Sequence, residues 1–332
     1  MFSAPRIPGW RHVFSGKARE IYVRESSSSY ESPIPAQHNA MSERFSVAQA
    51  LRGHTEILIV ATDRICLDGQ ILPTPIPDKG KILTRLTSWW FDQLADMVPG
   101  HILDEEPAEL PHELDGRSLV CSTLTMLPVE CFVRGYLTGT AYEEYRRRHT
   151  ICGQRFPEGL HEAAPLQPAL FTPTTKSTLG DRNINIGVDR FDEVLGEDEA
   201  DTIRDLSLRL YSRAVEIARH AGFTIAATAF EFGTDRHGGV VMGDELLTPD
   251  TTLYWDMEHA DSALTSPQPG VPHDFCTYPV AQWLRSQAQD RSQLPDSPHS
   301  EAAPPPLPDS VVEETRRQYC TLYERLTGES CV

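Results

Sequence analysis

Two carboxylates stand on the arms of one expected β-hairpin, at positions where a cation could hold them together. The arms of residues 230–255 alternate apolar and polar side chains, and residues 235–239 supply the turn. Folding the arms about that turn puts Glu231 opposite Asp244, where Cβ atoms lie ~5 Å apart and like charges repel. Mg²⁺, which binds carboxylates together with substrate phosphates, would remove the repulsion. A hairpin with a solvated acidic face is the alternative interpretation.

A tight turn at Ser15-Gly16-Lys17 is the second candidate for chemistry. It lies between two short expected strands within residues 10–24. A glycine beside a lysine lets backbone N–H groups approach a phosphate, although most such turns are only turns. The chain has few lysines and many arginines, which favours a role for the compact ammonium groups that remain. The lysines are Lys17, Lys79, Lys81 and Lys176.

The elements that must position these residues follow from periodicity and from turn signals. We expect a buried strand over 56–64, a proline-punctuated loop over 71–83 with an amphipathic helix after it, a strand and then a charged helix within 118–148, a helix over 189–221, and a closing helix over 310–328. Residues 25–54 have no sustained period, and we expect them to form a mobile surface insertion.

Composition narrows the class of protein. The chain has 332 residues and a formal charge of −18, so it can bury more than one core, and its charge argues against nucleic acid or an anionic membrane as partner. No apolar run is long enough for a membrane span, and no signal peptide is visible. Seven scattered cysteines without a zinc-type spacing favour reduced thiols and a cytoplasmic location.

Taken together, the motifs resemble those of the phosphoribosylaminoimidazole-succinocarboxamide synthase (SAICAR synthetase) family. The matching runs, in order, are SGKAREIY, ATDRI, PTPIPDKGKILTRLTSWWF, LPVECFVRGYLTGTAYEEY, LFTPTTKSTLGD, FEFGTD, GDELLTPDTTLYWD and PPPLPDSVVEETRRQYCTLYERLTG. They cover most of the chain outside residues 25–54 and 256–303. Eight motifs in the correct order indicate homology, although homology does not by itself establish activity.

The resemblance implies an α+β fold in which a small antiparallel β lobe lies over a larger α/β lobe, with ATP in the cleft. On this chain the small lobe would be residues 1–127, and the larger lobe, with the hairpin and the closing helix, residues 128–332. The family joins a ribotide carboxylate to the amine of aspartate through an acyl phosphate made from ATP. The expected cofactors are therefore ATP and Mg²⁺, and the expected partners are small molecules: a purine-type intermediate and aspartate.

The resemblance also assigns residues to the nucleotide and the metal. The assigned nucleotide-binding residues are Ser15, Gly16, Lys17, Ala18, Arg19, Lys81, Met126, Leu127 and Glu130. The strand at 126–130 is expected to meet adenine through its backbone, with Glu130 at the ribose. Glu231 and Asp244 match the magnesium carboxylates of the family, in agreement with the interpretation of the hairpin as a cation site.

The acceptor side matches less well. The resemblance assigns catalytic roles to Asp63, Arg134 and Lys176, and substrate binding to Arg64, Arg134, Gly139, Thr140 and Asp181. Charged residues of the family are replaced, however, by Ala227, Ala229, Leu253 and Ala281. Each lost arginine at a ribotide phosphate would forfeit ~1.5–3 kcal/mol.

Three hypotheses follow from this asymmetry. The first is an ATP-dependent ligase with an altered acceptor, recruited to specialised purine-derived nucleoside biosynthesis. The second is the ordinary SAICAR synthetase reaction, which joins carboxyaminoimidazole ribotide to aspartate with compensating residues. The third is a nucleotide-binding pseudoenzyme that acts as a scaffold or regulator. The retained carboxylates and Lys17 favour turnover of ATP over scaffolding, and the altered acceptor positions favour the first hypothesis over the second.

Overall fold

The structure is a computed structural model of the full chain. It describes residues 4–25, 47, 50–67, 69–105, 110–176, 184–266, 270–292 and 304–331. The expected insertion at 25–54 lies for the most part outside these residues, as does Asp181. Within the described part of the chain, no helix is long and apolar enough to cross a membrane.

The N-terminal part of the chain forms a four-stranded antiparallel sheet in the order β1-β2-β3-β6. Its strands are β1 (Trp10–Ser15), β2 (Arg19–Arg24), β3 (Glu56–Ala61) and β6 (Ser118–Ser122). The predicted strands within 10–24 and 56–64 are confirmed. Alternating burial along β2 places Tyr22 in the core of this sheet.

A seven-stranded sheet forms the second half of the molecule, and all its pairings are antiparallel. The path is β11 (Pro165–Phe171), β8 (Val129–Tyr136), β13 (Phe223–Thr234) and β14 (Val240–Gly243), and its side strands are β7 (Thr125–Met126), β12 (Thr174–Thr175) and β15 (Thr252–Asp256). Two short hairpins complete the strands: β4 (Cys66–Leu67) with β5 (Gln70–Ile71), and β9 (Thr150–Ile151) with β10 (Gln154–Arg155).

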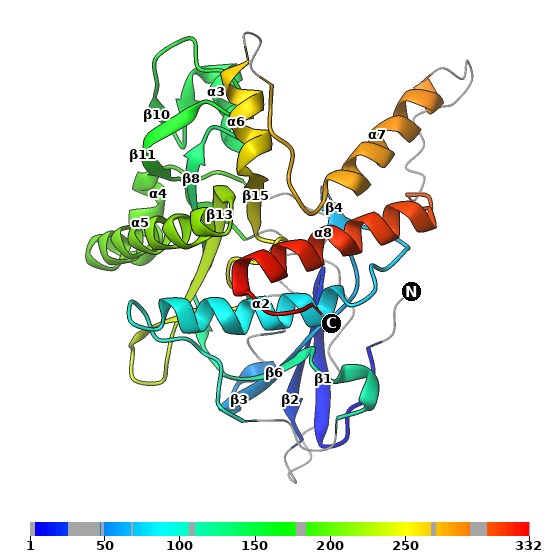
Figure 1. The fold of residues 1–332 in the computed structure, drawn as a ribbon. Coiled ribbons are helices and arrows are strands. Elements are labelled where there is room, and N and C mark those ends of the chain that lie inside the picture. Colours follow the sequence, from blue (N-terminus) through cyan, green and yellow to red (C-terminus); the bar gives the residue numbers. More distant parts are fainter. Residues whose placement is uncertain are drawn as a thin grey trace.

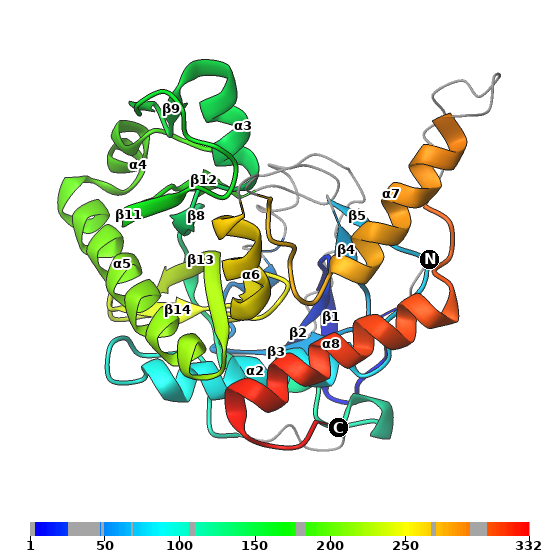
Figure 2. The same ribbon diagram turned by 45° about the horizontal axis from the view of Figure 1, so that its top comes forward.

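Helices cover both sheets (Figures 1 and 2). They are α2 (Lys79–Leu94), α3 (Gly139–Arg148), α4 (Val188–Leu195), α5 (Glu197–His220), α6 (Met257–Thr265), α7 (Tyr278–Ser292) and α8 (Asp309–Thr327), with a short 3-10 helix at His112–Leu114. Helix α5 packs against β13 and β8, and α8 lies alongside α2. This mixed architecture agrees with the predicted α+β class.

Two helix predictions need correction at their boundaries. The helix expected over 189–221 is two helices, because Gly196 adopts φ 88° between α4 and α5, a conformation that a helix cannot continue through. Helix α2 begins at Lys79, within the expected loop, because Asp78 takes a left-handed conformation with φ 65° and the chain turns into the helix there. The charged helix at the end of 118–148 and the closing helix near 310–328 are confirmed by α3 and α8.

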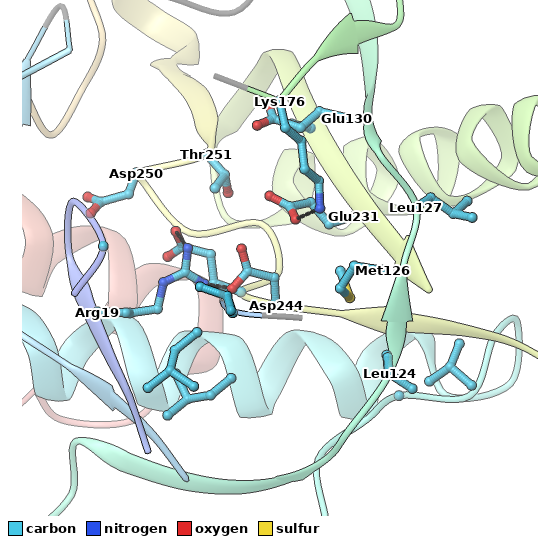
Figure 3. A pocket seen from close by; sticks show the side chains of 18 of the residues that line it. Arg19, Leu124, Met126, Leu127, Glu130, Lys176, Glu231, Asp244, Asp250 and Thr251 are labelled. Carbon is cyan, nitrogen blue, oxygen red and sulfur yellow. Dashed lines mark hydrogen bonds and ion pairs between the residues drawn. The ribbon is translucent and has the colours of Figure 1, made fainter. Parts of the chain in front are cut away.

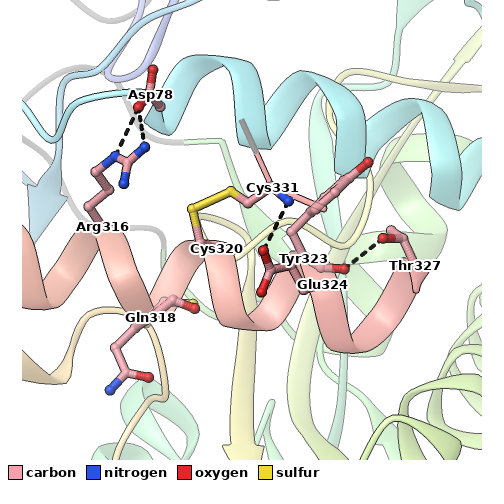
Figure 4. The surroundings of a disulfide bond; sticks show 9 residues. Asp78, Arg316, Gln318, Cys320, Tyr323, Glu324, Thr327 and Cys331 are labelled. Carbon is pink, nitrogen blue, oxygen red and sulfur yellow. Dashed lines mark hydrogen bonds and ion pairs between the residues drawn. A yellow bond between two sulfur atoms is a disulfide. The ribbon is translucent and has the colours of Figure 1, made fainter. Parts of the chain in front are cut away.

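The expectation that all cysteines are reduced is wrong for one pair. Cys320 on α8 and Cys331 form a disulfide, with Cα atoms 5.4 Å apart (Figure 4). The tail can return to the helix because Gly328 ends α8 with φ 76°. The backbone N–H of Cys331 then donates to Glu324 Oε1 at 3.0 Å. The other five cysteines are free.

Candidate functional site

A large cavity of about 1710 Å³ is lined by both sheets and by the segments between them. Most of the residues predicted for the nucleotide, metal and acceptor share this one cavity. Those that line it are Gly16, Lys17, Ala18, Arg19, Met126, Leu127, Glu130, Arg134, Gly139, Lys176, Glu231 and Asp244. The fold therefore brings together the ends of motifs that are more than 200 positions apart in the sequence, and Figure 3 shows several of them.

The β1–β2 turn presents Lys17 to the cavity. The backbone N–H of Gly16 donates to the carbonyl of Arg19 at 2.7 Å, which closes the turn. The carbonyl of Ala18 accepts from the backbone and the hydroxyl of Thr62, at 2.7 and 2.8 Å. The turn is thus fixed from β3, and its lysine ammonium is available to an anionic ligand.

Arg64 supports this turn from behind. Its guanidinium donates to the carbonyls of Lys17 at 3.2 Å and Gly16 at 2.8 Å, and it pairs with Glu20 at 2.5 Å. The side chain is buried, and Arg64 is not among the described residues that line the cavity. The contacts seen here hold the turn, and the predicted role of Arg64 in substrate binding stays a prediction.

Glu20 is the buried anion under the turn. Burial raises the pKa of its carboxyl, but hydrogen bonds from His12, Ser15 and Arg64 outweigh burial and bring the pKa below its usual value. The carboxylate therefore remains charged beneath the turn at neutral pH. Ser15 is predicted to bind the nucleotide. In this structure its hydroxyl donates to Glu20 at 2.5 Å and so helps to hold the turn together.

Three neighbouring strands bring Lys176, Glu130 and Glu231 together (Figure 3). Thr174 of β12 pairs with Glu130 of β8, and Lys176 follows directly after β12. Phe230 of β13 pairs with Cys131 of β8, which puts Glu231 beside them. The ammonium of Lys176 lies 2.5 Å from Glu231 Oε2.

The predicted register of the hairpin is wrong by one residue. Glu231 pairs with Gly243, and Asp244 lies just beyond the end of β14. Asp244 takes a left-handed conformation with φ 61°, which aspartate tolerates better than most residues. This bend turns the chain so that both carboxylates line the same cavity without facing each other across the ladder.

Asp244 and Glu245 share one cation. Arg19 Nη1 pairs with Asp244, and Arg19 Nη2 lies 3.1 Å from Glu245 Oε1. Burial raises the pKa of Glu245, whereas Arg19 opposes that rise. The ring of His101 lies 3.2 Å from the carbonyl of Asp244. Burial, and then Arg19, lower the pKa of His101 to about 4, so the imidazole is neutral at physiological pH.

The acceptor side of the cavity is less charged. The strand register puts Ala227 of β13 beside Arg134 of β8 and Leu253 of β15, and Ala229 beside Phe132. All five of these side chains line the cavity. Of the five residues just named, four are apolar, and Arg134 carries the one charge.

Arg134 is buried and already has several partners. Its guanidinium donates to Thr172 Oγ1 at 3.1 Å, to the carbonyl of Thr138 at 3.4 Å and to Thr140 Oγ1 at 3.3 Å. Burial lowers its pKa to about 10, which leaves it charged at neutral pH. Thr140 and Arg134 are thus in contact at the start of α3, as the predicted acceptor turn requires.

Five predicted site residues are not among the described residues that line the cavity: Ser15, Asp63, Arg64, Lys81 and Thr140. Asp63 accepts from the backbone N–H of Gly80 at 2.9 Å and pairs with Arg117 at 3.0 Å, so it holds the start of α2. Lys81 lies on α2. Neither is among the described residues that line the cavity. Their predicted catalytic and nucleotide-binding roles stay predictions.

Several polar residues of the site were not predicted. Lys79 donates to Asp250 Oδ2 at 2.5 Å, and Asp250 and Asp274 line the cavity with Glu245. Burial raises the pKa of Asp274 to about 7, against hydrogen bonds from Cys276 and Thr277. The scarcity of lysine was a signal for Lys79, whereas nothing in the spacing of Asp274 indicates burial.

The described residues hold no group of three or more His, Cys, Asp or Glu side chains arranged to bind a metal. Glu231 and Asp244 nevertheless suit Mg²⁺, which commonly takes one or two protein carboxylates and completes its shell with water and phosphate oxygens. In the structure each of the two carboxylates is close to a cation, Lys176 or Arg19.

The fold thus gathers a lysine-bearing turn and two carboxylates in one large cavity, an arrangement suited to an enzyme with a phosphate-bearing ligand. A sequence model of the SAICAR synthetase family matches residues 48–275. The chain therefore belongs to the SAICAR synthetase family, a family of ligases that form C–N bonds, and the predicted family and fold are confirmed.

Individual relatives agree with this assignment. The phosphoribosylaminoimidazole-succinocarboxamide synthase of Thermobifida fusca is 38% identical over 98% of this chain and 93% of its own. The synthase of Streptomyces coelicolor is also 38% identical, over 98% and 96%. Among solved structures, the Saccharomyces cerevisiae SAICAR synthase complexed with SAICAR aligns with a TM-score of 0.75 and 28% identity, covering 99% of this chain and 98% of that one.

Proposed function

We propose that this protein is an ATP- and Mg²⁺-dependent ligase that joins a substrate carboxylate to an amine, and that its substrates are carboxyaminoimidazole ribotide and aspartate. The observation that carries the proposal is the convergence of Lys17, Lys176, Glu231, Arg19 and Asp244 on one cavity. Similarity to named synthases over nearly the whole chain supports the same reaction. The yeast relative, solved with SAICAR, supports a ribotide-type ligand. This reaction was the alternative in our sequence analysis, and the comparisons favour it over an altered acceptor.

The residues of the cavity suit a reaction of two steps, in which the carboxylate is activated first and the amine attacks second. Bound Mg·ATP would supply the phosphoryl group that activates the substrate carboxylate, and the amine would then displace phosphate. Lys17 would hold phosphate oxygens from the β1–β2 turn, and Lys176 would leave Glu231 to contact the transferring group. Glu231 and Asp244 would hold the metal. Such positioned charges stabilise phosphoryl transfer mainly by electrostatics.

The altered acceptor remains a second candidate, because one observation favours it. Ala227, Ala229 and Leu253 line the cavity beside Arg134, and they supply no charge to a ribotide phosphate. A phosphate removed from water needs compensating cations. The second candidate is therefore a purine-type acceptor bound by its base or ribose, in specialised nucleoside biosynthesis.

ADP release by the purified protein distinguishes the two candidates. We expect turnover with carboxyaminoimidazole ribotide, aspartate and Mg·ATP together, and none when any one is omitted. If that mixture releases no ADP, but the same mixture with the dephosphorylated ribonucleoside in place of the ribotide does, the second candidate replaces the first. Tight binding of Mg·ATP without turnover of either acceptor would refute both and leave a nucleotide-binding pseudoenzyme. The cytoplasmic location stays a prediction.

A further inference from the structure

Asp250 is a cavity carboxylate whose two oxygens are both held by buried donors. The Nζ of Lys79 lies 2.5 Å from Oδ2, and the hydroxyl of Tyr319 donates to Oδ1 at 3.0 Å. Lys79 and Tyr319 are each 0% exposed, whereas the Asp250 side chain is 17% exposed. The carboxylate is therefore fixed from inside the protein and open on its cavity side.

Two distant helices deliver these donors. Lys79 is the first residue of α2, and Tyr319 lies in the middle of α8. The helices are tied at the same point, because Arg316 of α8 donates twice to Asp78 Oδ2, at 2.8 and 2.6 Å (Figure 4). Tyr319 follows Arg316 by one helical turn and so faces the same junction.

The loop that carries Asp250 is held as firmly. The backbone N–H groups of Thr251 and Thr252 donate to the carbonyl of Thr248, at 3.1 and 2.9 Å. The backbone N–H of Asp250 lies 3.3 Å from Thr248 Oγ1. Both the backbone and the side chain of Asp250 are thus restrained. Such restraint is needed in a group that must contact a ligand at a fixed position.

The surroundings determine what kind of ligand the carboxylate suits. A buried lysine beside a carboxylate compensates its charge, so the pair does not require a cationic ligand. Burial raises the pKa of Tyr319 well above its usual value, so its hydroxyl remains a neutral donor. The free lone pairs of Asp250 suit neutral N–H and O–H donors, such as amino groups and ribose hydroxyls.

The position of Asp250 indicates which substrate it meets. It lies two residues before β15, whose Leu253 pairs with Ala227 on the acceptor wall. In Figure 3, Asp250 and Thr251 lie on the opposite side of the view from Met126 and Leu127, the residues predicted to meet adenine. Asp250 therefore belongs to the acceptor side of the cavity.

Resting on the ligase function proposed above, we infer that Lys79 and Tyr319 are positioning residues for the acceptor. They hold Asp250 so that it accepts hydrogen bonds from the amino or hydroxyl groups of the substrate that carries the reacting carboxylate. Helix α8, remote in sequence from every predicted site residue, is by this inference part of the acceptor site.

Tyr319→Phe tests the inference, with Tyr323→Phe as the matched control. Both tyrosines are buried on α8, but the hydroxyl of Tyr323 donates to Glu329 instead of to a cavity residue. We expect Tyr319→Phe to raise KM for the acceptor about tenfold, as loss of one hydrogen bond to a charged group would. KM for ATP should change less than twofold, and Tyr323→Phe should leave both constants unchanged.

Binding of SAICAR measured by calorimetry provides a readout independent of turnover. We expect Tyr319→Phe to weaken SAICAR about tenfold and ADP hardly at all, with Asp250→Asn acting in the same direction. Equal effects of the two tyrosine variants, or an equal loss for ADP, would overturn the inference while leaving the ligase function intact. If the native protein neither turns over carboxyaminoimidazole ribotide and aspartate nor binds SAICAR, the product of joining them, both the inference and the proposed function are overturned.

Discussion

The ammonium of Lys176 lies 2.5 Å from the Oε2 of Glu231, so a predicted catalytic cation and a predicted metal carboxylate are in contact. Arg19 and Asp244 form a second such pair. Each pair joins a group suited to phosphate with a group suited to Mg²⁺. If Mg²⁺ and phosphates bind together as proposed, each carboxylate could exchange its cation for the metal and each cation its carboxylate for a phosphate. No charge would then be left unpaired at any stage.

This arrangement predicts that nucleotide binding depends on the metal. Replacing Glu231 by Gln and Asp244 by Asn should abolish the Mg²⁺-dependent part of ATP affinity, because the metal loses its protein ligands. Lys176 and Arg19 remain in the variant, so ATP with EDTA should bind at least as well as to the native protein. Calorimetry with and without Mg²⁺ makes the comparison, and Glu216→Gln on the exposed face of α5 is the control. Unchanged Mg·ATP affinity would exclude these carboxylates as metal ligands.

Lys17 should contact phosphate and not the nucleoside. Lys17→Ala should weaken ATP and ADP by ~1.5–3 kcal/mol, the range for a hydrogen bond to a charged group, and adenosine hardly at all. Competition binding against a fluorescent nucleotide gives all three affinities. Equal losses for the three ligands would show that the β1–β2 turn lies away from the phosphates.

Asp274 should make stability depend on pH in a definite direction. Its folded pKa of about 7 lies above the unfolded value near ~3.9. The folded state therefore binds more protons between these values, and the contribution of Asp274 to stability falls as pH rises through that window. Asp274→Asn should raise the free energy of unfolding more at pH 8 than at pH 4, by up to ~4 kcal/mol for a pKa that folding raises from ~3.9 to about 7.

Urea unfolding at the two pH values measures that difference. Asp96→Asn, on an exposed residue just after α2, is the control and should show no such pH dependence. A stabilisation of equal size at both pH values would show that folding does not raise the pKa of Asp274.

The disulfide should stabilise the protein by restricting the unfolded chain. Cys320 and Cys331 are separated by 11 positions, and closing a loop of this length contributes about 3 kcal/mol in the chain-entropy model. The double variant Cys320→Ser, Cys331→Ser should lower the urea midpoint accordingly, and dithiothreitol should have the same effect on the native protein but none on the variant. Identical midpoints for native protein in the presence and absence of reductant would show that the bond does not form in solution.

Local patterns were sufficient to predict many of the elements. The strands around Lys17, the strand at 56–64 and the closing helix follow from alternation or amphipathicity, which depend on nearby residues alone. The predicted register of the 230–255 hairpin was wrong because the turn is centred on His237, which pairs Thr234 with Val240 and so Glu231 with Gly243. A difference of half a residue in the centre of a turn shifts every pair of the hairpin by one residue. The cysteine pair was missed because 11 positions separate the thiols, and only the turn at Gly328 brings them together.

The ordered motifs also led to much of the candidate site, since most of the residues they assigned line one cavity. The motifs could not show which protein groups each polar side chain contacts. Arg64 and Ser15 carry suitable groups, but the buried carboxylate of Glu20 binds both. Lys79, Asp250 and Tyr319 come from three distant segments, and no spacing in the sequence relates them.

The contact between Tyr319 and Asp250 has a consequence for biosynthesis. A ribosome makes the chain from its N-terminus, and domains begin to fold while the rest is still being made. The β1–β2 turn and the hairpin carboxylates are complete long before residue 319 leaves the ribosome, yet Asp250 receives its tyrosine donor only from α8. A nascent chain in which α8 is not yet made would thus carry the phosphate-binding parts with an Asp250 that lacks its tyrosine donor, and full acceptor recognition would have to wait for α8.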